Sequence, residues 1–79
     1  YPNPFNPVTT ISFTVAKQMD LKLVVYDMQG REIETLFNKS HAPGSYDVSW
    51  SAKDISSGIY FARLSTSTHE QIYKLMLIK

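Results

Sequence analysis

The residue types that could perform chemistry in this chain are present, but their spacing does not assemble a reactive site. His41 and His69 each stand alone in a stretch expected to be a polar loop, with no second ligand at the spacing of a zinc site. No Gly-x-Ser-x-Gly turn frames a serine nucleophile, so a catalytic triad is not indicated. The aspartates are scattered and do not form the dense oxygen loop that calcium prefers. We therefore expect no enzyme, no bound metal and no cofactor.

Composition and charge exclude further classes of function. The 79 residues suffice for one domain, and their formal net charge is only +1. No cluster of basic residues produces the positive electrostatic potential that attracts nucleic acids or anionic membranes, so neither partner is expected. No apolar run approaches the length of a membrane span, which predicts no membrane insertion. The sequence has no cysteine, and this composition is compatible with both an oxidising and a reducing compartment.

The first seven residues, Tyr1-Pro2-Asn3-Pro4-Phe5-Asn6-Pro7, form a proline-rich leader. Each proline fixes its own φ angle and pushes the preceding residue toward extended geometry. We therefore predict an extended, semi-rigid leader over residues 1–7, followed directly by a strand. A stiff entry of this kind indicates a module placed at the end of a larger protein.

Short runs of alternating apolar and polar residues recur along the chain and predict β-strands. Turn residues separate these runs, as in Asp27-Met28-Gln29-Gly30, where the aspartate can bond its own turn and the glycine can take a positive φ. No segment has helical periodicity over the length that a helix needs. We therefore predict an all-β fold, an Ig-like antiparallel β-sandwich of six to seven short strands. The inward side chains are expected to be Ile11, Phe13, Val15, Leu21, Leu23, Val25, Tyr46, Val48, Trp50, Tyr60, Ala62 and Leu64.

Two segments have a less regular pattern. Residues 31–37 break the alternation at Leu36 and Phe37, which are adjacent, so this strand is expected at a sheet edge or with a bulge. Residues 38–44 are predicted to form a polar loop. The last run, residues 70–79, is apolar on both faces near its end. It fits a central strand covered on both sides, or an edge strand whose backbone can pair with a receptor.

Two Gly-x-Tyr triplets, Gly44 to Tyr46 and Gly58 to Tyr60, stand where loops enter strands. Glycine allows a positive φ at such a point, and the tyrosine can pack its ring while its hydroxyl bonds to backbone. This structural role is compatible with recognition of the folded shape. Arg63 lies mid-strand on the face opposite Tyr60, so it must be exposed or paired.

Several motifs occur together in a characteristic order. They are the leader, Tyr26-Asp27 followed by Gly30-Arg31-Glu32, then Pro43-Gly44-Ser45-Tyr46, the strand Ser57-Gly58-Ile59-Tyr60-Phe61-Ala62-Arg63-Leu64, and the terminal Lys74-Leu75-Met76-Leu77-Ile78-Lys79. In this order the chain resembles the type A C-terminal sorting domain of the bacterial type IX secretion system over essentially all its length. It also resembles the Ig-like domain of flagellar hook-capping proteins, and the lysine at the end favours the sorting domain.

The resemblance implies a non-catalytic sorting signal at the C-terminus of a larger secreted protein. The implied partners are an upstream cargo domain, the outer-membrane translocon, and a sortase-like peptidase that removes the domain for surface anchoring or release. The implied location is the cell surface or the medium, reached through the periplasm of a Gram-negative bacterium. Formation of a dimer through the last strand is also compatible with the sequence. The signal elements of the family correspond here to Gly44, Tyr46, Gly58, Tyr60, Arg63, Lys74 and Lys79.

Two other functions are compatible with the sequence. An accessory carbohydrate-binding domain would need coplanar exposed aromatic side chains, and the candidates are Tyr26, Trp50, Phe61 and Tyr73. A structural Ig-like spacer would need no exposed site. The solvent exposure of the aromatic rings separates the carbohydrate-binding function from the others.

Overall fold

The fold is built from six β-strands joined by short connections. A computed structural model of the chain describes residues 8–52 and 54–78, so the expected leader at residues 1–7 and the terminal Lys79 lie outside the described residues. No helix occurs in the described ranges, which confirms the all-β prediction. None of the described segments is therefore a helix that could cross a membrane. The strands are β1 (Val8–Val15), β2 (Met19–Tyr26), β3 (Glu32–His41), β4 (Gly44–Ser51), β5 (Gly58–Ser65) and β6 (Glu70–Leu77).

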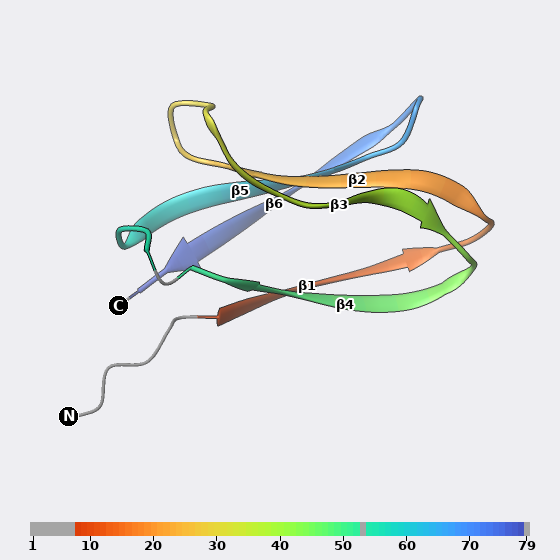
Figure 1. Cartoon of the computed structure of the whole chain (residues 1–79), viewed down its shortest axis with the longest axis horizontal. Coiled ribbons are helices and arrows are strands. Elements are labelled where there is room, and N and C mark those ends of the chain that lie inside the picture. Colours follow the sequence, from red (N-terminus) through yellow and green to blue (C-terminus); the bar gives the residue numbers. More distant parts are fainter. Residues whose placement is uncertain (1–7, 53, 79) are drawn as a thin grey trace.

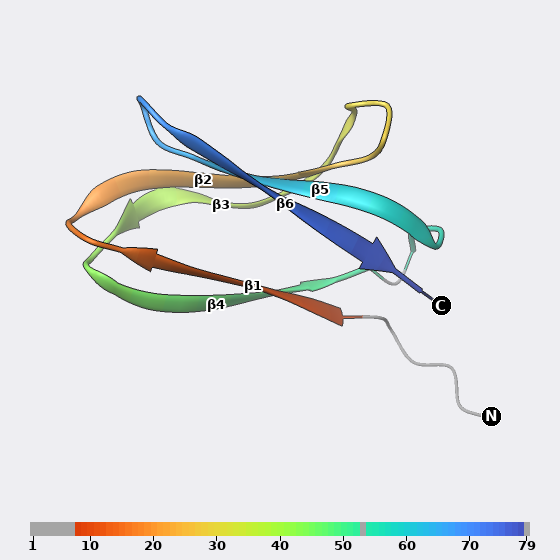
Figure 2. The same cartoon turned by 180° about the vertical axis from the view of Figure 1, so that it is seen from behind.

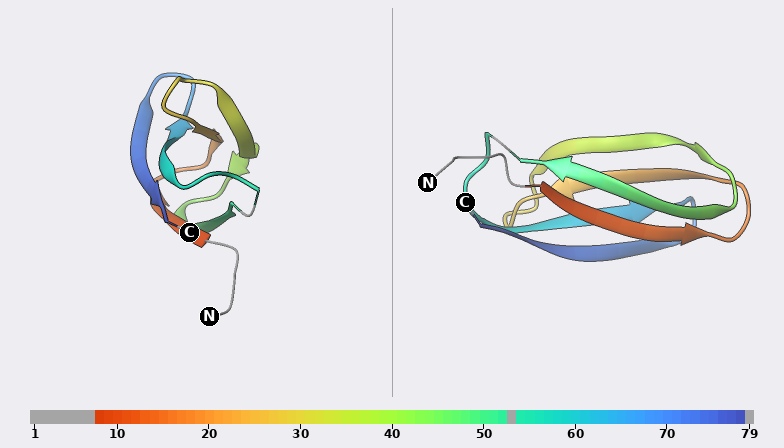
Figure 3. Two further views of the ribbon diagram at one scale, coloured as in Figure 1. Left: turned by 90° about the vertical axis from the view of Figure 1, so that its left-hand side faces the viewer. Right: turned by 90° about the horizontal axis from the view of Figure 1, so that it is seen from below.

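The strands form two antiparallel sheets that face each other (Figure 1). The smaller sheet pairs β1 with β4, and the larger sheet has the strand order β3-β2-β5-β6. Figure 2 shows the same two layers from behind, and Figure 3 shows them from the side and from below. This arrangement confirms the predicted sandwich of short strands.

Alternation along the strands places one face of each sheet in the core. The inward residues predicted for β1, β2 and β5 are buried, and Trp50 of β4 is 1% exposed. Tyr46 and Val48 are half-buried and pack against the core. Val24 is also buried, although it points away from the core, because β2 is a central strand with neighbours on both sides. Alternation therefore predicted most of the core, but the list of inward residues lacked Val24 and also Ala52, Leu75 and Leu77.

Strand β3 is longer than the sequence indicated, and the predicted polar loop over residues 38–44 is wrong. The strand continues to His41, and only Ala42 and Pro43 separate it from β4. The polar residues before His41 pair with the start of β2, so backbone hydrogen bonds hold them in the sheet while their side chains remain exposed. The predicted irregularity is confirmed, because the register between β2 and β3 shifts within this edge strand.

The position of β6 decides between the two predictions for the last strand, because β6 lies at an edge of the larger sheet. It pairs with β5, and its other side has no partner strand within the described ranges. The strand crosses the sandwich obliquely, so its end approaches the start of β1 (Figure 2). As a result, β1 begins and β6 ends at the same end of the molecule (Figure 1).

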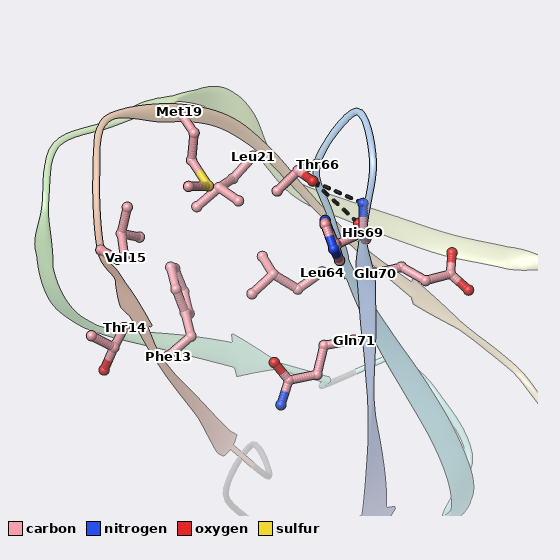
Figure 4. Close-up of a pocket in the computed structure, with 11 residues that line it drawn as sticks. Phe13, Thr14, Val15, Met19, Leu21, Leu64, Thr66, His69, Glu70 and Gln71 are labelled. Atoms are coloured by element: carbon pink, nitrogen blue, oxygen red, sulfur yellow. Dashed lines mark hydrogen bonds between the residues drawn. The ribbon is translucent and has the colours of Figure 1, made fainter.

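Toward the other end of the molecule, β1 and β6 diverge and leave a hollow of ≈ 400 Å³ between the sheets (Figure 4). Side chains that continue the core line it, among them Phe13, Met19 and Leu64. The turn between β5 and β6 closes one side, where the Thr66 hydroxyl accepts the backbone N–H of His69 at 3.0 Å. His69 is exposed in this turn, as predicted. The hollow is therefore a largely apolar opening in the flank of the sandwich.

Asp27 organises the turn between β2 and β3, as the sequence predicted. Its Oδ1 accepts the backbone N–H groups of Gln29 and Arg31, both at 2.9 Å, and its Oδ2 accepts the Arg31 guanidinium at 2.8 Å. Gly30 takes a φ of 85°. The backbone N–H of Arg31 is the largest cause that holds the pKa of Asp27 below its ordinary value of 3.8, although partial burial opposes the shift. The Arg31 guanidinium and the N–H of Gln29 also lower this pKa.

Asp27→Asn is therefore expected to destabilise the domain in a pH-dependent way. A carboxyl whose pKa is lowered by folding stabilises the fold above its unfolded pKa, and this contribution is lost as the pH falls through the folded pKa. The difference in unfolding free energy between wild type and Asp27→Asn should be largest near neutral pH and should shrink below about pH 4. Urea denaturation at a series of pH values measures it. Asp20→Asn, at an exposed carboxylate outside the turn, is the control, and the same pH trend in both variants would contradict the prediction.

Candidate recognition site

The two Gly-x-Tyr triplets form the same structure at the starts of β4 and β5. The hydroxyl of Tyr46 donates to the carbonyl of Ala42 at 2.5 Å, and the hydroxyl of Tyr60 donates to the carbonyl of Ser56 at 2.7 Å. The glycines of the two triplets have φ angles of 152° and 156°, a conformation that other residues rarely adopt. These observations confirm the predicted backbone bond of each tyrosine hydroxyl and the predicted positive φ of each glycine.

Each tyrosine ring also covers its own glycine. A Cβ atom added to either glycine would lie 3.9 Å from the ring of the tyrosine two residues later. The two structures lie at opposite ends of the sandwich, because the start of β4 pairs with the end of β1 and the start of β5 pairs with the end of β6 (Figure 1). The triplets therefore fix how the chain enters two strands, and their rings do not share a surface.

The two tyrosines have different surroundings. Tyr60 is buried, and its ring packs edge-on against Trp50 with 5.6 Å between centroids. Tyr46 is half-buried, and its ring stacks on Phe13 at 5.4 Å. The indole N–H of Trp50 donates to a carboxylate oxygen of Glu34 at 3.2 Å. Trp50 is therefore a core residue, which removes it from the candidate sugar-binding surface.

His41 is buried at the end of β3, so its predicted place in a polar loop is wrong. Its ring centroid lies 4.6 Å from that of Phe37 and 4.9 Å from that of Tyr46. Its Nδ1 is 3.1 Å from the carbonyl oxygen of Lys39. Aromatic rings thus surround this histidine, and residues 8–52 and 54–78 contain no group of metal-ligating side chains large enough to hold an ion.

Arg63 projects from the outer face of the larger sheet, opposite the core, as the alternation of β5 predicted. Its Nη2 donates to the hydroxyl of Tyr26 at 2.5 Å, and its guanidinium carbon lies 4.8 Å from the centroid of that ring. Its Nη1 is 3.9 Å from a carboxylate oxygen of Glu70. The side chain of Arg63 is also 43% exposed, so it is paired and accessible at once.

Lys74 is exposed on β6, where it lies across from Phe61 on the same outer face as Arg63. Arg63 and Lys74 are thus the predicted signal residues that share a surface in the described part of the chain. The residues of the two Gly-x-Tyr triplets lie at the strand entries, and Lys79 lies outside the described residues. The seven predicted residues therefore do not form a single patch.

The outer face also contains residues that are not among the seven predicted signal residues. Tyr26 and Phe61 are cross-strand partners, and Ile72 of β6 is exposed beside Arg63. The alternation of β5 predicted that Phe61 points outward, but its pairing with Tyr26 depends on the register between β2 and β5. Among the candidate sugar-binding residues, Tyr26 and Phe61 lie on this face, whereas Tyr73 packs against the core.

Known proteins provide an independent comparison. No curated protein and no solved structure matches the chain. The sequence model of the secretion system C-terminal sorting domain family matches residues 1–79, which agrees with the resemblance of the motifs. Domains of this family are non-catalytic sorting signals of type IX secretion, which act with the secretion machinery and lead a cargo domain to the cell surface or to secretion. Because the match spans the whole sequence, the chain belongs to the family of type IX secretion system C-terminal sorting domains.

Proposed function

We propose that this domain directs a larger cargo protein through the type IX outer-membrane translocon, from the periplasm of a Gram-negative bacterium to the cell surface or the medium. A sortase-like peptidase then removes the domain, and the cargo is anchored or released. The observation that carries this proposal is the family match over residues 1–79. In this function the domain acts by being bound, and the cargo supplies any activity.

The positions of the signal residues support two distinct roles within the domain. The Gly-x-Tyr triplets fix the entry of β4 and β5 and so maintain the shape that a receptor meets. Arg63 and Lys74 project from the outer face of the larger sheet, where a receptor can reach them. We assign these two residues, together with Lys79, to contact with the translocon.

A secretion assay tests the proposal. Residues 1–79 are fused to the C-terminus of a reporter enzyme in a bacterium that has the type IX machinery, and a separate leader takes the fusion across the inner membrane. The reporter is expected at the cell surface or in the medium, and retention in the periplasm would overturn the proposal. A host strain without the translocon is the control, because the reporter should stay in its periplasm.

Lys74→Gln tests the last strand without removing it. Deletion of residues 74–79 is expected to abolish export, but it also removes the buried Leu75 and Leu77 from the core and so weakens the fold. Lys74→Gln keeps the strand and should lower the exported fraction of the reporter roughly fivefold, the value for a contact of about 1 kcal/mol. Lys39→Gln, at another exposed lysine on β3, should leave export unchanged. Equal export by both variants would remove Lys74 from the signal.

The outer edge of β6, which pairs with no other strand among residues 8–52 and 54–78, is the second element that we assign to receptor binding. A strand at a sheet edge presents unpaired backbone groups with which another extended segment can pair. The order of the larger sheet, with β6 at its end, supports this assignment. A second copy of the domain is the alternative occupant of this edge. Analytical ultracentrifugation separates the two, because a concentration-dependent dimer would favour self-pairing and a monomer would favour a receptor.

A further inference from the structure

Arg63 is held in place on the outer face of the larger sheet. Its Nη2 donates to the hydroxyl of Tyr26, and its guanidinium carbon lies 4.8 Å from the centroid of the same ring. An arginine that is already stacked and hydrogen-bonded loses less conformational freedom when it binds a ligand than a mobile surface arginine does. The guanidinium is therefore pre-organised for binding.

The described part of the chain uses little of the hydrogen-bonding capacity of Arg63. A guanidinium carries several N–H donors in a planar fork. Within the described residues, the Tyr26 hydroxyl is its one hydrogen-bond acceptor, and the nearby Glu70 oxygen is 3.9 Å from Nη1. That distance exceeds a hydrogen bond, and an ion pair between two such exposed groups is weak. Arg63 therefore offers donors and a poorly compensated positive charge to a ligand.

Apolar side chains surround this guanidinium in a shallow pocket of ≈ 310 Å³ between the β2–β3 turn and strands β5 and β6. Met28 and Ile72 are 65% and 52% exposed, so the apolar part of the pocket is open to a ligand. Asp27 also lines the pocket, but Arg31 and the turn N–H groups occupy its carboxylate. We name this site, formed by Tyr26, Met28, Phe61, Arg63 and Ile72, the Arg63 pocket.

We propose that the Arg63 pocket binds a carboxylate side chain of a partner polypeptide, with a neighbouring apolar side chain of the partner seated against Phe61 and Ile72. A carboxylate can accept two parallel N–H bonds from one guanidinium, and its negative charge complements the positive charge of Arg63. The inference rests on the proposed function, in which the partner is a protein of the secretion machinery.

The charges of the pocket favour a single carboxylate over a polyanion. A polyanion is matched by several clustered cations, whereas the described lining of the Arg63 pocket holds one guanidinium and the Asp27 carboxylate. The occupant that fits is therefore an acidic residue flanked by apolar residues in an otherwise ordinary protein segment.

An amide chemical-shift titration of the full chain tests the class of ligand. The probes are acetyl-Leu-Glu-Leu-amide, the same peptide with Gln in place of Glu, and inorganic phosphate. The glutamate peptide should shift the resonances of Tyr26, Phe61, Arg63 and Ile72, and it should bind about tenfold more tightly than the glutamine peptide, as expected for one charged hydrogen bond. Equal shifts with both peptides, or none, would overturn the proposal. Larger shifts with phosphate would overturn it too, in favour of a polyanion site.

Single substitutions test whether the glutamate peptide binds at Arg63. Arg63→Gln removes the charge and should weaken binding of the glutamate peptide about tenfold. Arg63→Lys keeps the charge without the planar fork, and Tyr26→Phe removes the hydroxyl that holds the guanidinium, so both should also weaken binding. Tyr26→Phe keeps the test possible if Arg63→Gln does not fold. Lys22→Gln removes an exposed cation from the same face of β2 and should bind like wild type. Unchanged binding by the Arg63 variants, or an equal loss in Lys22→Gln, would contradict the site.

The reporter fusion separates failure of this inference from failure of the proposed function. Export of the wild-type fusion together with reduced export of Arg63→Gln and Arg63→Lys supports both. Full export of Arg63→Gln overturns the Arg63 pocket as a recognition site and leaves the sorting function standing. No export of the wild-type fusion, combined with binding of the glutamate peptide at Arg63, overturns the sorting function and supports the pocket as a carboxylate site.

Discussion

Trp50→Ala is expected to lower the free energy of unfolding by about 3–5 kcal/mol, the cost of removing a large buried aromatic side chain. Trp50 is among the largest fully buried side chains of the domain. Its ring packs against Tyr60, and its indole N–H is bonded to Glu34. A chain of 79 residues has a total stability of roughly 4–12 kcal/mol. The variant should therefore lose a large share of its stability, and at the lower end of this range it would be mostly unfolded.

Urea denaturation followed by circular dichroism measures this loss, because Trp50 is the sole tryptophan and its fluorescence disappears with the substitution. Val8→Ala is the control, since Val8 is 58% exposed on β1 and its truncation should cost less than about 1 kcal/mol. A loss of less than about 1 kcal/mol for Trp50→Ala would show that this ring does not support the core.

Gly58→Ala should cost about 1–3 kcal/mol, because residue 58 has a φ of 156° that strains any residue with a Cβ atom. Tyr60→Phe keeps the ring and removes the hydroxyl, so the Ser56 carbonyl loses its donor at a cost of about 1 kcal/mol. Tyr46→Phe should cost less than Tyr60→Phe, because the hydrogen bond of Tyr46 is exposed to water. Thermal and urea unfolding of the three variants measure these differences.

Ser56→Ala is the matched control for these substitutions. It removes the exposed hydroxyl of residue 56 but keeps the backbone carbonyl that accepts the Tyr60 hydroxyl, so stability should not change. A cost equal to that of Tyr60→Phe would contradict the assigned hydrogen bond. In the secretion assay, export of the Gly58 and Tyr60 variants should follow their measured stabilities, because these residues act on shape and not by direct contact.

The sandwich could be predicted because most of its strands are buried on one face. Alternation from Ile11 to Val15 in β1 and from Tyr60 to Leu64 in β5 named side chains that the structure places in the core. The pattern reports which face of a strand is buried, but not where the strand lies in its sheet. Val24 shows the difference, because its burial on the outer face depends on strands β3 and β5 beside it.

Strand β3 could not be predicted in full because an edge strand needs few apolar residues. Backbone pairing with β2 holds residues 38–40 in the sheet, and their polar side chains resemble those of a loop. The same resemblance concealed His41, whose burial results from aromatic rings contributed by three different strands, namely Phe13, Phe37 and Tyr46. Phe13 belongs to another sheet and is far from His41 in sequence, so its contact has no local sequence signal.

Only those contacts of the recognition site that join residues close in sequence could be predicted. The tyrosine hydroxyl bonds span four residues, so the Gly-x-Tyr triplets indicated them directly. The outward direction of Arg63 followed from its neighbours in β5. Its partner Tyr26 is 37 residues away in sequence, and their contact depends on how β2 and β5 are aligned. The Arg63 pocket therefore emerges only when the sheet is assembled.

The shared end at which β1 begins and β6 ends determines how the domain responds to mechanical tension (Figure 3). A pull between these two strands first loads the pairs Val8–Ser51 and Gly58–Leu77, which lie at that end. The backbone hydrogen bonds then break one after another, as in a zipper, instead of sharing the force along the whole strand. A domain gripped by its last strand while its cargo pulls on the first would thus unravel under small forces.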